Sequence, residues 1–177
     1  MTNPFQVGGN IGYMSFELAS KHPHLKCVVQ DVPEYQDQFK AAVPSDVSSR
    51  VQYKVHDFFD PQPVQAEVYF FRFIFHDWSD PYSIEIIRAI LPAMKDGSRI
   101  IVMDSCAPKQ GQLPWAGERT IALMDMQMLV AFNSKERTED DWYELFQKAD
   151  ERLEVKGIKT PPGSAISVIE VVFHEKK

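Results

Sequence analysis

The chain has 177 residues, which is enough for one well-buried domain and too short for two of ordinary size. It carries 19 Lys and Arg against 25 Asp and Glu, a formal net charge of -6, and the basic residues are scattered, which argues against a nucleic-acid partner. No apolar stretch approaches the length that a bilayer requires, and the first residues lack the order of a secretory signal, so we expect no membrane partner and a cytoplasmic location. Cys27 and Cys106 lie far apart in apolar, strand-like runs, which is typical of buried free thiols in a reducing compartment.

Short apolar runs alternate with segments of helical periodicity over the first two thirds of the chain. The predicted strands are residues 5–7, 25–31, 51–55, 66–75 and 98–105. The predicted helices are residues 11–22, 33–42 and 80–94, and Pro33 and Pro81 stand where a helix would begin. Strands that alternate with helices imply a parallel sheet joined by right-handed crossovers.

The last third of the chain adds two helices and a pair of strands. Residues 118–132 form a predicted methionine-rich helix, and residues 138–149 another, with Thr138 and Asp141 spaced close to a capping box. Residues 151–159 and 164–173 flank a Pro-Pro-Gly turn and predict a closing antiparallel hairpin. Because no linker or repeat interrupts the chain, residues 1–177 are interpreted as a single α/β domain with a mostly parallel sheet closed by that hairpin.

Three glycines follow the first predicted strand. Ligands of open parallel sheets bind beyond the carboxyl ends of the strands, where Gly8, Gly9 and Gly12 would let the backbone approach a ligand closely. Asp31 ends the second strand, and its carboxylate could accept hydrogen bonds from two ribose hydroxyls, which favours a nucleoside-containing cofactor. The alternative is a turn that only packs strand against helix, with Asp31 capping the next helix.

Asp57 and Phe58 repeat this arrangement one strand later. A carboxylate beside an aromatic face would suit an adenine ring. A solvated turn acid beside a core phenylalanine explains the same two residues equally well.

His76 follows a predicted buried strand and precedes a helix, which would place its imidazole at the same edge of the sheet. Its reference pKa near 6.5 suits a group that takes a proton at neutral pH. Asp104 ends the fifth strand and Glu136 precedes a late helix, so both could reach the ring, orient it and stabilise its protonated form. The alternatives are a hydrogen-bonded core histidine and acids that act as caps or surface charges. No pair of His, Cys or carboxylates has a spacing that compels a metal site.

Six segments, taken together and in this order, carry a resemblance to a known family: VGGNIG, DVP, HDFF, FRFIFHDWSDPYS, IIVMDS and SKERTEDDWYELFQKA. They resemble the S-adenosylmethionine-binding domain of the caffeic-acid-type O-methyltransferases of plants and fungi, over nearly the whole chain. The His-Asp-Trp-Ser-Asp and Lys-Glu-Arg-Thr runs are the most specific parts. The resemblance implies a Rossmann-like class I methyltransferase fold, which is a three-layer sandwich.

The resemblance also implies a cofactor site for S-adenosylmethionine. The glycine loop would hold the methionine part, Asp31 the ribose hydroxyls, and Asp57 with Phe58 the adenine. Arg72 would lie near the cofactor, where the family usually has a lysine.

The catalytic roles that the resemblance implies centre on His76 as the general base, flanked by Asp104 and Glu136. The acceptor would be a small aromatic or polyketide-like molecule. The residues implied to contact it are Met128, Asn133 and Trp78.

The sequence departs from the family pattern in three places. Gln6 stands where the family usually has an acid, which removes a negative charge near a cationic cofactor. Asn10 interrupts the glycine run, although asparagine is the next most tolerant residue of a left-handed backbone. Arg72 keeps the charge of the usual lysine but not its shape.

Family members also carry a helical amino-terminal domain that dimerises and helps to wall the acceptor pocket. The resemblance begins here at the first strand of the cofactor domain, so we expect that amino-terminal dimerisation domain to be absent. The surface that it would cover should be apolar and exposed. We therefore expect a homo-oligomer or pairing with another chain through that face.

The leading hypothesis is an enzyme that transfers a methyl group from S-adenosylmethionine to a hydroxyl of a small aromatic or polyketide-type metabolite. Two other hypotheses remain open: a protein of this fold that catalyses a rearrangement, cyclisation or elimination by proton transfer, and a non-catalytic partner of a full-length relative. The retained histidine and acids favour some form of catalysis. The altered glycine loop and the expected absence of the amino-terminal domain favour the two hypotheses without methyl transfer.

Overall fold

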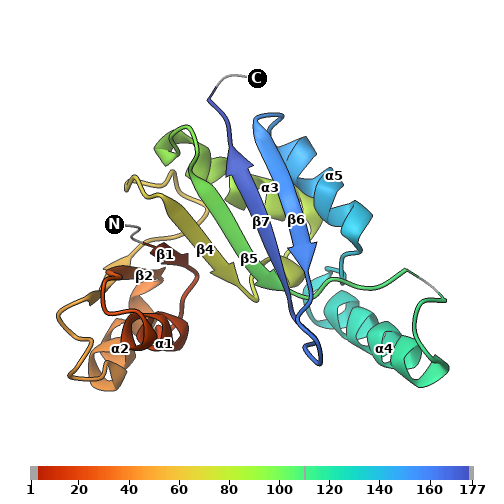
Figure 1. Cartoon of the computed structure of the whole chain (residues 1–177), viewed down its shortest axis with the longest axis horizontal. Coiled ribbons are helices and arrows are strands. Elements are labelled where there is room, and N and C mark those ends of the chain that lie inside the picture. The colour runs from red at the N-terminus through yellow and green to blue at the C-terminus, as the bar shows by residue number, and fades with distance from the viewer. Residues whose placement is uncertain (1–3, 110, 176–177) are drawn as a thin grey trace.

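The computed structural model describes residues 4–109 and 111–175, and the described strands form one seven-stranded sheet (Figure 1). The strands are β1 (Pro4–Val7), β2 (Cys27–Asp31), β3 (Val51–Val55), β4 (Val68–Arg72), β5 (Arg99–Asp104), β6 (Leu153–Lys159) and β7 (Ser167–Phe173). Their order is β3-β2-β1-β4-β5-β7-β6; β1 to β5 run parallel, and β7 is antiparallel to both β5 and β6. The predicted α/β class and the closing hairpin are confirmed. Strand order reverses between β1 and β4, so their carboxyl ends flank the crevice in which such sheets bind ligands.

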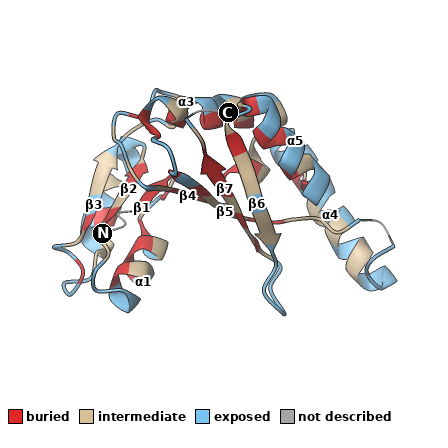
Figure 2. Ribbon diagram, turned by 45° about the horizontal axis from the view of Figure 1, so that its top comes forward, coloured by how far each residue is buried: buried red, intermediate tan, exposed pale blue. Residues whose placement is uncertain are grey.

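Helices flank the sheet on both faces. They are α1 (Tyr13–Lys21), α2 (Gln36–Ala42), α3 (Asp80–Ile90), α4 (Trp115–Phe132) and α5 (Glu139–Ala149), with three short 3-10 helices η1 (Pro33–Tyr35), η2 (Phe75–Asp77) and η3 (Leu91–Ala93). The helices α3 and α5 pack together behind β5, β7 and β6, whereas α1 and α2 lie beside β2 and β3, and α4 extends away from the sheet (Figures 1 and 2).

Two apolar cores hold these layers together. The larger one joins α3 and α5 to the sheet and includes the fully buried side chains Tyr69, Phe71, Ile87 and Phe146. The smaller one joins α1 and α2 to β2 and β3. Successive side chains of β4 point to opposite faces of the sheet, and its three central residues are all buried, so both faces of this strand are covered. The strongly apolar sequence of the strand predicts this.

The predicted strand 66–75 is too long at both ends, because β4 covers only Val68–Arg72. Phe73 has a φ of 52°, a left-handed conformation that a β-strand does not accommodate, and its N–H donates to the carbonyl of Met103 at 3.0 Å. The chain then turns into η2 instead of continuing the strand. This turn places His76 at the carboxyl edge of the sheet rather than within a strand.

Two further local predictions need correction. The predicted helix 118–132 begins three residues earlier, at Trp115, directly after Pro114. Cys106 is half-buried and lies just after β5, whereas Cys27 is buried within β2; both are free thiols. The expected capping box of α5 is confirmed, with Thr138 and Asp141 bonding each other's backbone N–H.

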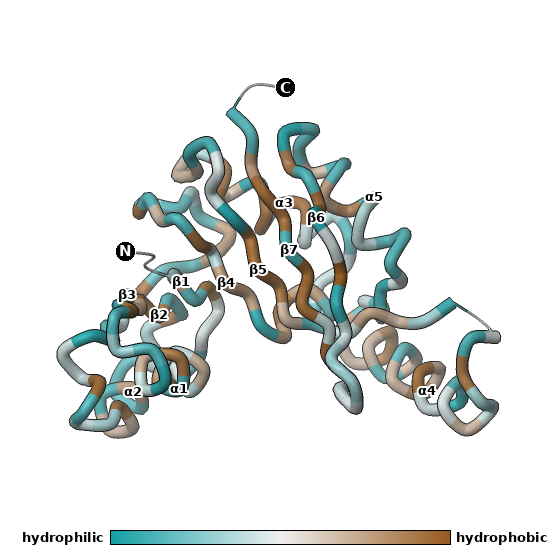
Figure 3. Tube along the Cα trace, in the orientation of Figure 1, coloured by the Kyte–Doolittle hydropathy of each residue, from teal (hydrophilic) through white to brown (hydrophobic). Residues whose placement is uncertain are grey.

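One face of the sheet remains open over β4, β5 and β7, where no helix of the described residues covers it (Figure 1). An entirely apolar hollow of about 290 Å³ lies there, lined by Pro4, Met14, Leu18, Leu25, Val68, Phe70, Ile101, Met103 and Val168. Apolar residues also continue along α4 (Figure 3). Of the 18 residues of α4 only Met128 is buried, so this helix presents most of its apolar side chains to solvent. None of the described helices is both long enough and apolar enough to cross a membrane.

Candidate active site

The loop after β1 is folded by its glycines and by Asn10. Gly8, Asn10 and Gly12 have φ values of 64°, 50° and 87°, the left-handed conformations that glycine and asparagine tolerate best. A Cβ on Gly9 would lie 2.7 Å from Cγ1 of Val29, and one on Gly12 would lie 3.0 Å from Cγ2 of the same residue. Gly9 and Gly12 therefore allow the loop to pack directly on β2, and the turn survives the replacement of a glycine by Asn10.

Asp31 ties this loop to the end of β2. Its Oδ2 accepts a hydrogen bond from the N–H of Asn10 at 2.7 Å, and its Oδ1 accepts one from the N–H of Val32 at 2.8 Å. Each carboxylate oxygen has two acceptor positions, so both retain one that can receive a ligand hydroxyl. The residue is half-buried and could still hold ribose hydroxyls, whereas the next helix, η1, has Val32 at its N-cap and no side-chain cap, so Asp31 does not cap it.

Gln6 lies beneath the same loop and is buried. Its Oε1 accepts a hydrogen bond from the hydroxyl of Ser15 in α1 at 2.6 Å. This amide therefore supports the junction of β1 and α1, at the position where the family usually has an acid.

An aromatic cluster adjoins the glycine loop on the other side. The ring of Phe58 packs edge-on against Phe59 and Trp78, with centroid distances of 5.1 and 5.8 Å, and lies next to Gly8. Asp57 is exposed, and its Oδ1 accepts a hydrogen bond from the N–H of Phe59 at 3.0 Å. The cluster offers apolar ring surface beside a carboxylate, which matches the chemistry of an adenine site.

His76 lies in η2 among three acids. Its Nδ1 is 3.8 Å from Oδ1 of Asp104 and 3.8 Å from Oε1 of Glu136, and its Nε2 is 3.4 Å from Oδ1 of Asp77. The histidine side chain keeps 19% of its surface exposed, whereas Asp104 is fully buried. The ring therefore directs one nitrogen toward two buried carboxylates and remains reachable from solvent.

Burial and charge act in opposite directions on this cluster. Desolvation by itself would lower the pKa of His76, but Glu136, Asp104 and Asp77 outweigh it, so the pKa is raised above its usual value. Desolvation raises the pKa of Asp104 to about 6, although His76 and the N–H groups of Ser105 and His76 oppose that change. The cluster consequently holds a proton more tightly than its separate groups would, close to neutral pH.

Backbone contacts fix the two buried acids. Oδ2 of Asp104 accepts a hydrogen bond from the N–H of His76 at 3.2 Å, and Oδ1 accepts one from Ser105 at 2.9 Å. The N–H of Glu136 donates to Oδ1 of Asp125 in α4 at 2.8 Å. Neither carboxylate oxygen of Glu136 has a hydrogen-bond partner among the described residues, so both remain available to His76 or to a ligand.

Hollows on both sides of Glu136 could admit a small molecule. One of about 500 Å³ lies between α4 and the segment after β5, and its lining includes Trp115, Ile121 and Glu136. A smaller one of about 50 Å³ is lined by Ser105, Met124 and Glu136, among others. A hollow of about 830 Å³ lies at the opposite, amino end of β4 and β5, which is not where parallel sheets bind their ligands. In the described part of the chain, no cluster of three metal-ligating side chains has the arrangement of a metal site.

Comparison with known protein families shows to which family the chain belongs. The profile of the O-methyltransferase domain matches residues 1–150. The chain belongs to the O-methyltransferase family. The resemblance inferred from the sequence motifs is thereby confirmed.

Fungal O-methyltransferases are similar to nearly all of this chain. The grayanic acid biosynthesis cluster O-methyltransferase of Cladonia grayi is 43% identical over 169 residues, which cover 94% of this chain and 38% of that protein. The O-methyltransferase AMT9 of Alternaria alternata is 40% identical, with 94% of this chain and 40% of that protein covered. The chain thus spans about two fifths of the length of these curated relatives.

Solved structures of methyltransferase fold superimpose on this O-methyltransferase domain. LepI in complex with S-adenosylmethionine has a TM-score of 0.85 and 30% identity, and the match covers 98% of this chain and 43% of LepI. NcsB1, an O-methyltransferase from neocarzinostatin biosynthesis solved with S-adenosyl-L-homocysteine and 1,4-dihydroxy-2-naphthoic acid, has a TM-score of 0.82 and 27% identity, with 97% and 49% covered. The predicted class I methyltransferase fold is confirmed.

The remaining predicted residues of the O-methyltransferase site lie in different surroundings. Arg72 ends β4 with its guanidinium 4.5 Å from the ring centroid of Phe73, and its buried Nε has no partner among the described residues. Met128 is buried on α4, whereas Asn133 is exposed and ends that helix with a φ of 52°. Trp78 packs edge-on against Phe58 in the aromatic cluster described above, and its contact with the acceptor stays a prediction.

Sequence reasoning missed two residues of this site. Asp77 is next to His76 in the chain and faces its Nε2, and that adjacency was a usable signal. Arg137 is almost completely buried behind η2 and belongs to the Lys-Glu-Arg-Thr run, of which only Glu136 was assigned a role. Its contacts depend on residues more than fifty positions away, so no local pattern reveals them.

Proposed function

We propose that this chain carries the cofactor-binding and catalytic groups of an enzyme that transfers a methyl group from S-adenosylmethionine to a hydroxyl of a small aromatic or polyketide-type metabolite. The observation that carries the proposal is the position of His76 at the carboxyl edge of the sheet, with Nδ1 3.8 Å from both Asp104 and Glu136. Membership of the O-methyltransferase family and similarity to fungal O-methyltransferases support it.

The residues at the crevice fit S-adenosylmethionine, which when bound supplies an electrophilic methyl group on a sulfonium. Asp31 would accept hydrogen bonds from ribose hydroxyls through its remaining acceptor positions. The loop from Gly8 to Gly12 would present backbone groups to the methionine part. Phe58 and Asp57 would contact the adenine. The relatives LepI and NcsB1 have been solved with this cofactor or its demethylated product, which supports the assignment.

His76 would act as the general base through Nε2, because Nδ1 faces the two buried acids. A phenol has a pKa near 10, so a positioned base that takes its proton contributes on the order of 10²–10⁴ in rate. Asp104 and Glu136 would stabilise the imidazolium that forms. Since only the neutral imidazole accepts a proton and the pKa of His76 is raised, we expect the rate to increase with pH through a value above 6.5.

The acceptor would be a flat molecule of mainly apolar character. Ile121 and Trp115 line the larger hollow beside Glu136, and Met124 lines the smaller one, which suits an aromatic ring better than a sugar or a peptide. The structure of NcsB1 with a dihydroxynaphthoic acid supports the same substrate class.

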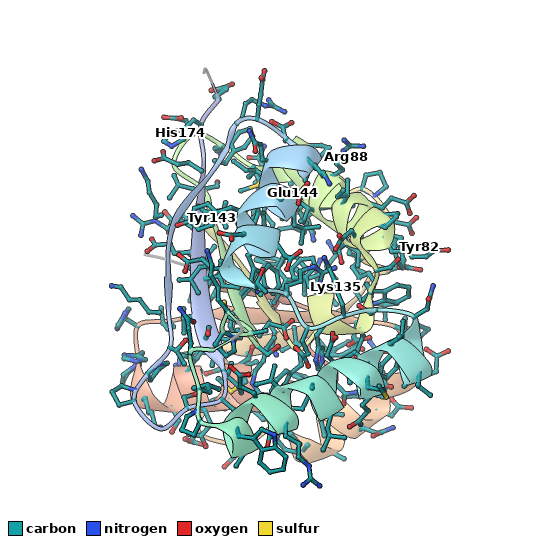
Figure 4. All side chains as sticks on the ribbon, turned by 90° about the vertical axis from the view of Figure 1, so that its right-hand side faces the viewer. Tyr82, Arg88, Lys135, Tyr143, Glu144 and His174 are labelled. Atoms are coloured by element: carbon teal, nitrogen blue, oxygen red, sulfur yellow. The ribbon has the colours of Figure 1, made fainter. Side chains whose placement is uncertain are left out.

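Calorimetry with S-adenosylmethionine, followed by detection of S-adenosylhomocysteine with a panel of phenols, tests the proposal. We expect binding and turnover, with His76→Ala losing at least a hundredfold in turnover while cofactor affinity changes little. His174→Ala is the matched control, because His174 also pairs with an acid, Glu154 at 2.8 Å, but follows β7 at the opposite end of the sheet (Figure 4). Equal turnover by His76→Ala and the wild type would remove His76 from the mechanism.

The alternative is proton-transfer chemistry without methyl transfer, and it has one observation in its favour. A solved pericyclic reaction enzyme is 30% identical to this chain, with a TM-score of 0.85 and 98% of this chain covered. Cofactor binding without release of S-adenosylhomocysteine from any phenol would favour this alternative over methyl transfer. Failure to bind the cofactor at all would contradict the assignment of the crevice and leave the partner hypothesis.

We further propose that two copies of this chain associate through α4. Leu123, Met126 and Val130 follow one another at helical spacing and are 60%, 62% and 81% exposed, a continuous apolar stripe of the kind that mediates protein contacts. Light scattering after gel filtration should show a dimer or larger species that Val130→Glu converts to monomer. Gln38→Glu, which adds the same charge on the exposed surface of α2, should leave the oligomer intact. A monomeric wild type at micromolar concentration would contradict this proposal.

A further inference from the structure

Arg137 is a buried charged side chain beside the site, with 1% of its surface exposed. Nε and Nη2 of its guanidinium donate to Oδ1 of Asp80 at 3.0 and 2.7 Å, and Nη2 also donates to the hydroxyl of Ser83 at 3.1 Å. The ring of Trp142 lies 5.4 Å from the guanidinium carbon. The buried charge is therefore paired and hydrogen-bonded, which is the condition under which such burial is tolerated.

The other contacts of Arg137 enclose the segment that carries the proposed base. Nη1 donates to the carbonyl of Phe75, the residue before His76, and Nη2 donates to the carbonyl of Trp78 at 2.9 Å. Both carbonyls belong to η2 or its end, so one side chain holds the backbone on either side of His76. Arg137 also follows Glu136 directly in the chain, which links the position of the base to that of its flanking acid.

We propose that Arg137 is a positioning residue, whose guanidinium holds η2 against the segment of Glu136 and so sets the separation of His76 from Glu136. The inference rests on the proposed function for its catalytic meaning, but the geometry it asserts can be measured without turnover. Three acids face His76, namely Asp77 from η2 itself, Asp104 from the end of β5 and Glu136 from the segment before α5. Arg137 acts behind the backbone of η2 and contacts none of these three carboxylates.

The planar fork of arginine is required for this arrangement. Five hydrogen bonds to four acceptor atoms in fixed directions use the rigid geometry of a guanidinium, whereas a lysine is a single point of charge on a flexible stem. Lys135 illustrates the difference, because it bridges Asp80 at 3.5 Å and Asp141 at 2.6 Å from the partly exposed surface. Substitution of Arg137 by lysine thus keeps the charge and removes the paired contacts to the carbonyls of Phe75 and Trp78, which we call the clamp.

The test follows the titration of His76 by NMR in the 177-residue chain, in the wild type, Arg137→Lys and Arg88→Lys. Arg88 is the matched control: it also donates to two backbone carbonyls, those of Lys148 and Ala149 at 3.0 and 2.9 Å, but at the end of α3 and α5 remote from Lys135 (Figure 4). In Arg137→Lys we expect the pKa of His76 to fall by about half a unit or more, because η2 moves away from the acids that raise it. Arg88→Lys should leave the titration unchanged. An unchanged pKa of His76 in a folded Arg137→Lys protein overturns the proposal.

Ser83→Ala keeps the proposal falsifiable if Arg137→Lys does not fold. The Ser83 hydroxyl accepts from Arg137 and donates to the carbonyl of Trp78 at 3.0 Å, so its loss weakens the same clamp more mildly. We expect the same direction of change at His76, and no change would overturn the inference. Where the wild type turns over, kcat should fall at least tenfold in Arg137→Lys with little change in KM for S-adenosylmethionine. A wild type without turnover would count against the proposed function only, since the NMR result decides the positioning role separately.

Discussion

Substitution of Asp104 by asparagine should stabilise the protein at pH 8 and destabilise its catalytic arrangement. Burial raises the pKa of Asp104 from 3.8 to about 6, so the ionised carboxylate is disfavoured in the folded protein. The pKa of Asp104 is about two units higher in the folded than in the unfolded state, and each unit corresponds to about 1.4 kcal/mol. Once the group is ionised in both states, the folded state is therefore destabilised by about 3 kcal/mol. The side chain is fully buried, so solvent does not screen this cost.

Asparagine would relieve that cost but retain only part of the hydrogen bonding. Asp104 uses both oxygens, one for the N–H of Ser105 at 2.9 Å and one for the N–H of His76 at 3.2 Å. The amide offers one acceptor oxygen, and the lost bond costs about 1 kcal/mol. The expected net gain for Asp104→Asn is therefore about 2 kcal/mol at pH 8.

The pH dependence is the sharper part of this prediction. Because the folded pKa is raised, the wild type gains stability from this group at low pH and loses it as the pH rises from 3.8 through about 6. Roughly half of the loss is already present at pH 5, so the advantage of Asp104→Asn should grow by about 1 kcal/mol between pH 5 and pH 8. Urea unfolding at the two pH values measures it. An advantage that stays constant or shrinks as the pH rises would refute the reasoning.

Two other substitutions test the elements that support the site. Asp141→Asn removes a carboxylate that lies 2.6 Å from the ammonium group of Lys135. Burial by itself would raise the pKa of Asp141, but its bonds to Lys135 and Thr138 lower that pKa to about 2. The substitution should therefore cost about 1 kcal/mol of stability in urea unfolding at pH 7, after solvent screening, and this cost should vanish as the pH falls toward 2. Gly9→Ala should cost about 1–3 kcal/mol of stability and weaken cofactor binding in calorimetry, because the added Cβ would lie 2.7 Å from Val29. Gly157→Ala is the control, since its Cβ would meet nothing within 4 Å. Equal stability of the two variants would contradict the packing argument.

The layered fold could be predicted because its signals are local. Alternation of strands and helices, the turn at 161–163 and the spacing of Thr138 and Asp141 each depend on neighbouring residues, and the structure has all three. The convergence of His76 and Asp104 follows from the geometry of parallel strands, whose carboxyl ends meet at one edge, whereas Glu136 reaches them from the segment between α4 and α5. Their catalytic roles stay predictions.

Features set by distant contacts could not be predicted in the same way. The end of β4 depends on the left-handed Phe73, which is held by a carbonyl of β5 thirty residues later in the chain. The packing of the Trp78 ring against Phe58, which comes from another loop, likewise has no local signal in the sequence. The helical periodicity of α4 does not tell which of its methionines are covered: Met128 is buried, Met124 is half-buried and Met126 is 62% exposed.

The candidate site buries two acids beside a single imidazole. Asp104 and Glu136 are both buried within 3.8 Å of one imidazole, and the carboxylate oxygens of Glu136 lack a hydrogen-bond partner among the residues described, so a protonated His76 stabilises the charge on both acids. A neutral His76 leaves two buried carboxylates without a counterion and would allow η2 to move away from them. The contacts of Arg137 to the carbonyls of Phe75 and Trp78 oppose such a movement, since they bind backbone that does not titrate. If His76 is the base, as we propose, these contacts would keep its ring in place while it is neutral, and the nearby acids, which raise its pKa, would stabilise the imidazolium that forms.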